Sequence, residues 1–517
     1  MNVASAYQDQ AGDVFAPAIE YFAGLVGRLK ATPARRMTHS EVEALIDDEG
    51  RESLRLLFQG YIDSHGLGEA EGEVRDADGM IRTHKPRAGR NLMTLFGAIR
   101  VRERQGYGAR GETVLYPLDA KLNLPADKYS FGTRRRMAEE ASKVSFDESV
   151  AAVNAYTGAC VAKRQAEQLV QRAARDFEPF YEQRAAPTDS PGALMVTTFD
   201  QKGLVFRTED LREATRKAAE RREHTYATRL SSGEKQDTKR MATVAAVYTI
   251  APFPRTAEDI LPARPRPVGD RPPAPRPENK RVWASVEDDA QDVIAAGFDE
   301  ALRRDPARSK TWLALVDGNR DQLRYVRRCA RKYGVAVTIV MDFIHVLEYL
   351  WKAAHAIYGE GCPAAETWVR RHGLEVLRGK AGYVAGGLRR SATLRKLTGR
   401  RRKRVLKAAR YLLKHKRYLR YDEYLAKGYP IATGVIEGAC RHLLVDRMDI
   451  TGARWGLIGA EAVIKLRALR SSGDFEEYWT FHEAQERRRN HVLRYANERL
   501  PRIHDPLTPR LRLAPRA

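Results

Sequence analysis

The strongest constraint on the fold is a series of short apolar segments between residues 190 and 350. Their lengths and their β-branched and aromatic content favour strands, and amphipathic stretches separate the later ones. Strands that follow one another directly predict hairpins, whereas alternation with helices predicts parallel crossovers. The order therefore predicts a mixed sheet in an α/β domain. The expected strands are 194–199, 204–206, 242–250, 311–316 and 335–341, with helices at 286–302 and 320–332.

Two aspartates occupy matching places in this pattern. Asp200 and Asp317 each follow an apolar strand and precede a polar turn that contains glycine. A carboxylate at the carboxyl end of a buried strand points into the crevice where open α/β sheets bind ligands. Two of them on neighbouring strands can bridge Mg²⁺ ions, and a third acid would complete a two-metal site for phosphodiester chemistry. The alternative is that each aspartate only forms a turn or caps a helix.

The charge balance narrows the class of partner. The 517 residues include 90 Lys and Arg against 67 Asp and Glu, a net charge of +23 with a pI near 9.8. Excess positive charge favours polyanions, because each phosphate contact releases condensed counterions. Nucleic acid is the first candidate, and an anionic membrane surface is the rival. No basic amphipathic stretch carries the aromatic anchors that binding to a membrane surface requires.

Targeting and redox features predict a cytoplasmic protein. The first residues do not resemble a signal peptide, and no run approaches the roughly 18 apolar residues of a membrane span. The cysteines lie far apart without a C-x-x-C pair, so neither a zinc ribbon nor a disulfide framework is expected. Buried packing is the expected role of all four, Cys160, Cys329, Cys362 and Cys440.

Changes in composition and hydrophobic pattern divide the chain into seven segments. Nine prolines in residues 252–277 also predict a long surface loop inside the α/β core. The hairpin module is expected to pair strands at 94–101 and 113–116. The segments are a helical region (1–90), a small β-hairpin module (91–125), a helix-turn-helix-like module (130–186), the core (190–350), a helical basic insertion (351–429), core-completing helices (430–475) and a basic, flexible tail (485–517).

Residues 146–176 have the outline of a helix-turn-helix module. Phe146, Val150 and Val153 follow helical spacing, the dipeptide at 157–158 interrupts it, and a basic helix follows. An ordinary helical hairpin with a solvated basic face is the alternative. If the chain binds DNA, the expected contacts are Lys163, Arg164, Arg172 and Arg175 in this module and Arg401, Arg402, Lys403 and Arg404 in the insertion.

Two longer stretches resemble a known family. One contains LVDGNRDQL and VAVTIVMDFIHVLEYLW, and the other reads TGVIEGACRHLLVDRMDITGARWGLIGAEAVIKLRALRSSG. Both are similar to the ISKra-type bacterial insertion-sequence transposases, which are relatives of the Mutator-like DDE enzymes. The likeness covers roughly residues 90–480 and is strongest in 311–350 and 430–475. It implies an RNase H-like core, a helical insertion before the last catalytic helix, and metal-dependent transposition.

The resemblance assigns a catalytic, metal-holding role to three acids. Asp200 and Asp317 correspond to the first and second acid, and Glu437 in the Gly-Val-Ile-Glu-Gly stretch corresponds to the third. Glu437 follows an otherwise apolar helix start, so its charge is expected to face a pocket. Asp446 and Asp449 are the competitors for the third place.

Four further residues are candidates for supporting roles. Asp342 and His345 match a C/D-x-x-H signature of the relatives and share a helical face, although they could equally be a structural polar pair. Arg454 and Trp455 lie in a Gly-Ala-Arg-Trp-Gly turn, and Trp455 could stack on an extruded base or fill the core. Some relatives carry a zinc ribbon near the amino terminus, but residues 102–116 here contain no cysteine.

The expected protein is thus a DDE transposase with an α/β, RNase H-like mixed-sheet catalytic core, a helical insertion, and a mainly helical amino-terminal DNA-binding region. It would use two Mg²⁺ or Mn²⁺ ions per active site to cleave DNA ends and transfer strands. Its partners would be double-stranded DNA, as terminal inverted repeats and target, and further copies of itself in a synaptic complex on the nucleoid. The alternatives are an RNase H-like nuclease that cuts without joining and a non-catalytic DNA-binding regulator derived from a transposase.

Overall fold

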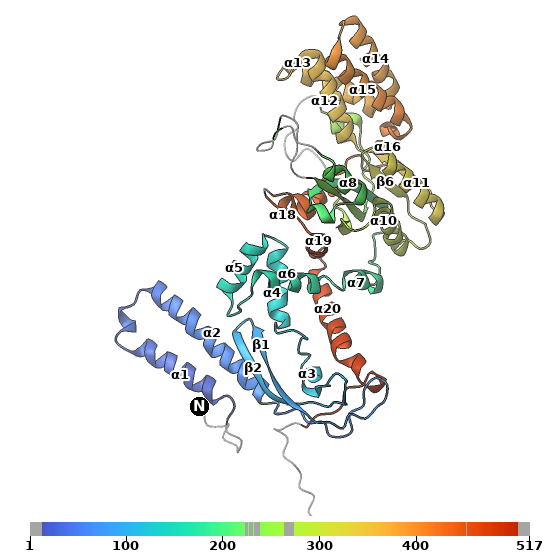
Figure 1. The fold of residues 1–517 in the computed structure, drawn as a ribbon. Helices are drawn as coiled ribbons and strands as arrows, with labels where there is room; N and C mark the ends of the chain where they lie inside the picture. Colours follow the sequence, from blue (N-terminus) through green and yellow to red (C-terminus); the bar gives the residue numbers. More distant parts are fainter. Residues whose placement is uncertain are drawn as a thin grey trace, which may run out of the picture. The chain divides into compact units, whose positions relative to one another are not determined.

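The chain divides into two compact units, one of residues 1–182 and 476–517 and one of residues 183–475. The computed structural model describes residues 13–222, 226, 231, 238–262, 273–450 and 452–504, and Figure 1 shows its helices and strands. Among the described helices, none combines the length and apolar character that crossing a bilayer requires.

The first unit is mainly helical. Helices α1 and α2 contact each other along their lengths, and a capping box at Thr38 and Glu41 begins α2. The helices of this unit and its boundaries are α1 (Ala16–Lys30), η2 (Ala34–Arg36), α2 (His39–Asp63), α3 (Pro117–Lys121), α4 (Phe131–Ala141), α5 (Phe146–Tyr156), α6 (Lys163–Ala173), α7 (Phe177–Gln183), α20 (Phe475–Asn490), η6 (Val492–Arg494) and η7 (Ala496–Glu498).

Helices α4, α5 and α6 pack on one another in the segment predicted to be helix-turn-helix-like (Figure 1). Serine side chains cap the first two, because Ser130 accepts from the Thr133 amide and Ser145 from the Glu148 amide. Residues 157–162 join α5 to α6. The outline predicted for 146–176 therefore exists as two packed helices, with α4 as a third.

The β-hairpin begins earlier than predicted, at residue 87 rather than 91. Strands β1 (Arg87–Thr94) and β2 (Gly97–Gln105) pair antiparallel, with Thr94 opposite Gly97. The predicted strand 94–101 thus spans the turn, because the φ of +123° at Gly97 lets the chain reverse there. The predicted strand 113–116 is also wrong, since it holds only an isolated bridge from Leu115 to Tyr107.

A buried network of ion pairs holds the first unit together. The guanidinium of Arg134, which is 1% exposed, lies 2.8 Å from the Glu486 carboxylate. Arg489 bridges Glu486 at 2.6 Å and Asp176 at 3.0 Å, and the His482 ring lies 2.7 Å from Asp176. Burial opposes ionisation of Glu486, yet its bonds to Arg134 and Arg489 lower its pKa to about 2. Each buried charge in this network is therefore balanced by an opposite one.

The second unit contains a five-stranded mixed sheet, which confirms the predicted α/β class. The first three strands pair antiparallel in succession, and the last two add in parallel on the other side of β3. The order across the sheet is β5-β4-β3-β6-β7. The strands are β3 (Leu194–Val205), β4 (Lys239–Ile250), β5 (Glu278–Ser285), β6 (Trp312–Val316) and β7 (Val337–Met341).

Two predicted features of this sheet are wrong. The two predicted strands 194–199 and 204–206 are parts of the single strand β3, which ends at Val205. Strand β3 pairs with β4 along its whole length, and this pairing keeps the polar residues between the two predicted strands in the ladder. Strand β5 was not predicted, since its first half is polar and partly exposed. The three consecutive strands at the start of the sheet are therefore β3, β4 and β5.

Helices cover both faces of the sheet. Successive side chains of a strand point to opposite faces, so Phe199 and Asp200 mark the two sides of β3. Helix α10 lies on the Phe199 side, where a Cβ on Gly297 would come within 2.7 Å of the Phe199 ring. Helix α17 lies on the other side, where the Cys440 thiol meets Asp200.

The helical insertion follows β7 directly. Helix α12 runs without a break through the predicted boundary at residues 350–351, and α15 packs against both α12 and α14. The remaining helices of the second unit are η3 (Thr208–Asp210), α8 (Glu213–Glu220), α9 (Ala257–Ile260), α10 (Ala290–Arg304), α11 (Arg320–Tyr333), α12 (Phe343–Tyr358), α13 (Pro363–Leu377), α14 (Ala381–Leu394), α15 (Gly399–His415), η4 (Lys416–Tyr418), α16 (Tyr421–Ala426), α17 (Gly434–Cys440), the π-helical turn η5 (Arg441–Val445), α18 (Asp446–Met448) and α19 (Leu457–Ser472).

Parts of several predicted segments lie outside the described residues. These include residues 1–12 of the helical region, 263–272 of the proline-rich loop, 451 of the core-completing helices and 505–517 of the carboxyl-terminal tail. The described part of the loop contains the short helix α9, and the described part of the tail contains the end of α20 followed by η6 and η7.

Candidate active site

Asp200 and Asp317 lie level with each other at the same edge of the sheet. The parallel register of β3 and β6 pairs Thr197 with Ala314 and Thr198 with Leu315. Continued two residues beyond the paired ladder, the same register would place Asp200 opposite Asp317, and the Asp200 charge does act on the pKa of Asp317. The prediction that the two carboxylates belong to neighbouring strands therefore agrees with the observed pairing.

The local setting of the two aspartates differs from the prediction in one respect. Asp317 follows the last residue of β6, and the φ of +94° at Gly318 turns the chain there, as expected. Asp200 lies inside β3 rather than at its end. Because β6 stops at Val316 while β3 continues along β4, Asp200 still marks the place where the parallel pairing ends.

The two carboxylates repel each other without a cationic partner. Among the described residues, neither Asp200 nor Asp317 forms an ion pair with Lys or Arg. Burial raises the pKa of Asp317, and the charge of Asp200 raises it further, whereas the Asn319 amide and the His345 ring act in the opposite direction. An edge of this kind has a deficit of positive charge that a divalent cation could fill.

Helix α17 carries Glu437 to this edge. The Cys440 thiol donates to Asp200 Oδ2 at 3.1 Å, which fixes the carboxyl end of the helix against β3. Glu437 precedes Cys440 by three residues and so shares its side of the helix. Burial raises the pKa of Cys440, and the negative charges of Asp200 and Glu437 both contribute. Glu437 itself is exposed rather than facing a closed pocket.

The amino end of α17 is tied to the start of α12. The Thr433 hydroxyl donates to Asp342 Oδ2 at 2.6 Å, and the Phe343 amide donates to the Ile431 carbonyl at 2.9 Å. Asp342 also caps α12 by accepting from the Ile344 amide at 3.0 Å. These bonds connect the segment that contains Glu437 to the end of β7, the strand that follows Asp317 in the chain.

Asp342 also holds His345 beside the second acid. The His345 Nδ1 atom lies 3.6 Å from Asp342 Oδ2, one helical turn away. The Asp342 carboxylate raises the pKa of His345, burial opposes it, and the Asp317 charge raises it further. The predicted pair Asp342 and His345 therefore lies at the candidate site, where one residue orients the other.

The competitors of Glu437 are occupied by cations. Asp446 lies 3.5 Å from Arg441 and 3.1 Å from His442. Asp449 lies 3.3 Å from Lys202 and 3.4 Å from Lys239. A carboxylate that is already neutralised by side chains is a poorer metal ligand than a free one, so this arrangement favours Glu437 as the third acid.

The carboxylates of Asp200, Asp317 and Glu437 suit a hard divalent cation, but the structure does not place all three around one common point. No group of three or more His, Cys, Asp or Glu side chains in the described parts of the chain is spaced to hold one metal ion. Asp200 and Asp317 supply carboxylate oxygens on adjacent strands, which is the chemistry that Mg²⁺ and Mn²⁺ prefer. Glu437 would have to approach them, and the π-helical turn η5 next to α17 is a feature often found at functional sites.

The two remaining supporting candidates lie after η5. Trp455 is 6% exposed, its indole donates to the Met448 carbonyl at 3.0 Å, and its amide donates to the Val205 carbonyl at 3.1 Å. This environment supports the core alternative for Trp455 and not stacking on a base. Arg454 is exposed beside it.

The predicted DNA-contacting side chains are all exposed but differ in their partners. In the first unit, Lys163 lies 2.7 Å from Asp147, and Arg172 pairs with Asp127. In the insertion, four predicted residues lie in the first turns of α15 and pair with no acid among the described residues: Arg401, Arg402, Lys403 and Arg404. The same is true of Arg164 and Arg175 in the first unit.

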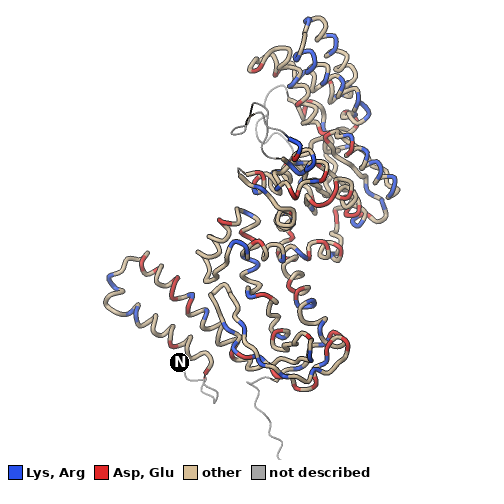
Figure 2. Tube along the Cα trace, viewed as in Figure 1, with Lys and Arg blue, Asp and Glu red and all other residues tan. Residues whose placement is uncertain are grey.

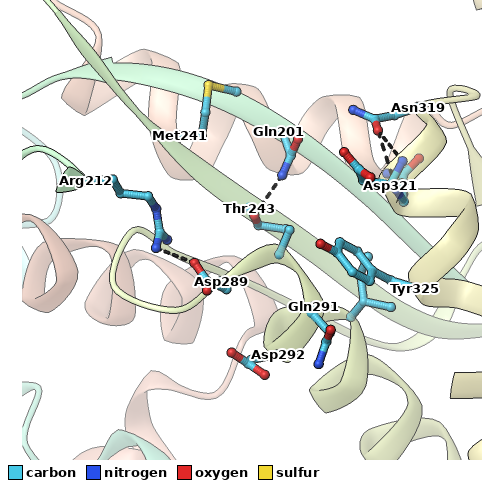
Figure 3. Close-up of a pocket in the computed structure, with 13 residues that line it drawn as sticks. Gln201, Arg212, Met241, Thr243, Asp289, Gln291, Asp292, Asn319, Asp321 and Tyr325 are labelled. Atoms are coloured by element: carbon cyan, nitrogen blue, oxygen red, sulfur yellow. Dashed lines mark hydrogen bonds and ion pairs between the residues drawn. The ribbon is translucent and has the colours of Figure 1, made fainter. Parts of the chain in front are cut away.

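A separate pocket of about 380 Å³ lies on the other face of the sheet (Figure 3). Gln201 lines it together with Thr243, to which it donates at 3.3 Å, and with the ion pair between Arg212 and Asp289. Since Gln201 follows Asp200 in β3, the two side chains point to opposite faces. The pocket is therefore distinct from the edge that carries the three acids.

Several residues at the site were not predicted from the sequence. Cys440 was expected to be only a buried hydrophobe, yet it contacts Asp200, and Thr433 bonds to Asp342. Tyr411 of α15 donates to the Asp317 carbonyl at 3.0 Å. Thr433 stands just before Gly434 at the start of a helix, which is a recognisable capping signal, but its actual partner lies in another helix.

Comparison of the chain with models of known protein families and with curated proteins gives no match. The function therefore has to be inferred from the arrangement of the residues themselves.

Proposed function

We propose that the chain is a DDE-type transposase, which cleaves DNA ends and joins them to target DNA in a metal-dependent reaction. The observation that carries the proposal is the placement of Asp200 and Asp317 on neighbouring parallel strands, with α17, the helix of Glu437, held against β3 by the Cys440 thiol. A sheet of three antiparallel strands followed by two parallel ones is the arrangement of an RNase H-like core, which supports the same assignment. The net charge of +23 supports a polyanionic substrate.

In this proposal the three acids Asp200, Asp317 and Glu437 would hold two Mg²⁺ or Mn²⁺ ions. Such ions activate water or a 3′-hydroxyl and stabilise the leaving oxygen. The strands fix the two aspartates, and the Cys440 thiol orients Asp200 by donating to one of its oxygens. The bond from Thr433 to Asp342 fixes the start of α17.

The partners in this proposal are double-stranded DNA and a second copy of the chain. The packed helices α5 and α6 would read the terminal inverted repeats, with Arg164 and Arg175 as the exposed cations that have no acidic neighbour among the described residues. Joining requires that two ends be held together, so at least a dimer is expected when DNA is bound.

A strand-transfer assay with labelled end DNA and Mg²⁺ tests the proposal. Joined product that disappears in the Asp317→Ala variant supports a transposase. Cleavage without joining would instead support an RNase H-like nuclease, and DNA binding without either reaction would support a regulator. The same assay without the divalent ion is the control for both cleavage and joining.

A further inference from the structure

The helical insertion contains the most one-sided charge in the molecule. Residues 376–421 include 17 Lys and Arg and no Asp or Glu. This segment contains α14, α15 and η4, and blue segments recur along these helices in Figure 2. Its ion pairs with acids lie near its two ends: Arg378 and Lys380 lie 2.8 Å and 3.0 Å from Glu375, and Arg420 pairs with Glu423.

Helix α15 separates its apolar and basic residues onto two sides. The side packed against α12 and α14 is buried and includes Val405, Ala408, Ala409 and Leu412. The opposite side is exposed and carries cations at alternating intervals of three and four residues, which places them in one row along the helix. The row consists of Arg400, Lys403, Lys407, Arg410 and Lys414, and we call it the α15 row.

None of the five cations of the α15 row forms an ion pair with an acid in the described structure. Helix α15 itself contains no acid that could neutralise them from a neighbouring turn. Exposed like charges one turn apart repel each other and destabilise a helix. The α15 row therefore destabilises the helix in the isolated protein, and a binding partner with negative charge would relieve this repulsion.

The row continues past the end of the helix. Arg417 of η4 lies 4.7 Å from the centre of the Tyr418 ring, and Arg327 of α11 lies 5.4 Å from the same ring. Burial lowers the pKa of Arg327, and the charges of Arg417 and Arg331 lower it further. Like charges therefore crowd together where α11 meets η4, again without an acid among the described residues that pairs with them.

We propose that the α15 row, continued by Arg417 and Arg327, binds the phosphate backbone of duplex DNA. This inference rests on the proposed function, because it takes the partner to be the DNA that the candidate site would cut. Cations one helical turn apart, about 5.4 Å, can reach successive phosphates with flexible side chains. The single aromatic residue of α15, Tyr411, is buried, so the face lacks the anchors that a membrane surface requires.

The test compares two double variants of the full chain that lose the same charge. Lys407→Gln with Arg410→Gln removes two members of the row, whereas Arg389→Gln with Arg390→Gln removes two exposed cations of α14 that lie off it. Duplex affinity is measured by fluorescence anisotropy at several salt concentrations. The row variant should bind on the order of tenfold more weakly at about 0.1 M salt, and its salt slope should fall by about two. The control variant should change both quantities much less.

The possible results separate the inference from the proposed function. Equal effects of the two variants would mean that only total charge matters, and this would overturn the inference while leaving the proposed function intact. A row variant that loses binding to vesicles of anionic lipid but keeps duplex binding would also overturn it. Failure of the unchanged chain to bind any duplex would count against the proposed function itself. Thermal unfolding of both variants should match the parent, because all four side chains are exposed.

A separate observation concerns the inner side of the same helix. The Tyr411 hydroxyl donates to the Asp317 carbonyl at 3.0 Å, and its ring stacks on Tyr349 with 4.0 Å between the ring centres. The turn at Gly318 is confined, since a Cβ there would lie 2.9 Å from the Met341 sulfur and 3.3 Å from His415. Helix α15 therefore closes over the turn that carries the second acid.

From this contact we infer that Tyr411 is a positioning residue for Asp317. Tyr411→Phe keeps the stacked ring and removes only the hydroxyl. The variant should bind Mn²⁺ about tenfold more weakly in a direct titration and should still bind duplex DNA normally. Tyr349→Phe is the matched control, because its hydroxyl forms no hydrogen bond that the described structure records.

Two results would overturn the role of Tyr411. One is Mn²⁺ affinity equal to that of the parent chain, and the other is an equal loss in the Tyr349→Phe control. The Asp317→Ala variant is measured alongside. If that variant also bound Mn²⁺ normally, the failure would lie in the proposed function rather than in the role of Tyr411.

Discussion

The two units differ in how they pair charges that are buried or half-buried. Around Glu486 in the first unit, every buried charge has an opposite partner within hydrogen-bonding distance, and the pKa of Glu486 is lowered to about 2. At the sheet edge of the second unit, Asp200 and Asp317 lie side by side without a Lys or Arg partner, and the pKa of Asp317 is raised. Balanced charges therefore stabilise the fold, whereas unbalanced charges indicate where a ligand of opposite charge binds.

The largest expected effect is the loss of activity at the unbalanced edge. Replacement of Asp200, Asp317 or Glu437 by Ala should lower strand transfer by about ten-thousandfold or more, as for other groups that act as a unit at a reacting centre. Folding and duplex binding should persist, because neither aspartate stabilises the fold through an ion pair with Lys or Arg. Strand-transfer rates and duplex affinities measure the two properties separately.

Asp446→Ala provides the control for this set. Its carboxylate already lies beside Arg441 and His442, so its removal should leave the rate near that of the parent. A loss of activity in this variant, together with normal activity in Glu437→Ala, would exchange the roles of the two residues.

The next effect concerns the balanced network. Glu486→Ala should destabilise the protein by about 3 to 5 kcal/mol, because it leaves the buried guanidinium of Arg134 without its closest partner. Denaturant unfolding measures this change. Glu498→Ala breaks the exposed pair with Arg488 and should cost less than about 1 kcal/mol. Similar losses in both variants would mean that burial does not determine the strength of these pairs.

The same network should make the protein sensitive to acid. The folded-state pKa of Glu486 is about 2, below its ordinary value of 4.5, so its contribution is present above the ordinary value and is lost as the pH falls toward 2. A decline of about 3 kcal/mol is expected across this range from this group. Unfolding followed from pH 6 to pH 2 should show a shallower decline in Glu486→Gln. An unchanged decline would assign the acid sensitivity to other carboxylates.

The smallest effect has the opposite sign. The pKa of Asp317 is raised, so its ionised form is a cost to the folded state at neutral pH. Asp317→Asn should therefore stabilise the protein, by about 1 kcal/mol or less, while it removes activity. Thermal unfolding without divalent ions checks the sign. A clear loss of stability would show that the Asp317 carboxylate stabilises the fold, as the Glu486 carboxylate does, and would contradict the prediction.

The sequence predicted the parts of the fold that depend on local pattern. The strands around 242–250, 311–316 and 335–341 are almost wholly apolar, and each forms close to its expected bounds. Strand β3 was predicted as two strands because its polar middle resembles a turn, and β5 was missed because its first half is polar. Pairing with β4 decides both cases, and this pairing is not visible in a local stretch of sequence.

The candidate site was predictable in its acids but not in the contacts that hold them. Asp200 and Asp317 could be found because each follows an apolar strand, and Glu437 because of the family resemblance. The bonds from Cys440 to Asp200 and from Tyr411 to Asp317 join residues 240 and 94 positions apart. Only the packing of the helices brings these partners together, so spacing in the sequence carries no sign of them.

Direct measurement of Mn²⁺ binding tests the central claim that Asp200, Asp317 and Glu437 hold divalent ions together. The full chain bound to end DNA is titrated with Mn²⁺, and the bound ions are counted by electron paramagnetic resonance. The account predicts two ions per chain in the parent protein and fewer in both Asp317→Asn and Glu437→Gln. Identical Mn²⁺ binding by the parent and both variants would contradict it.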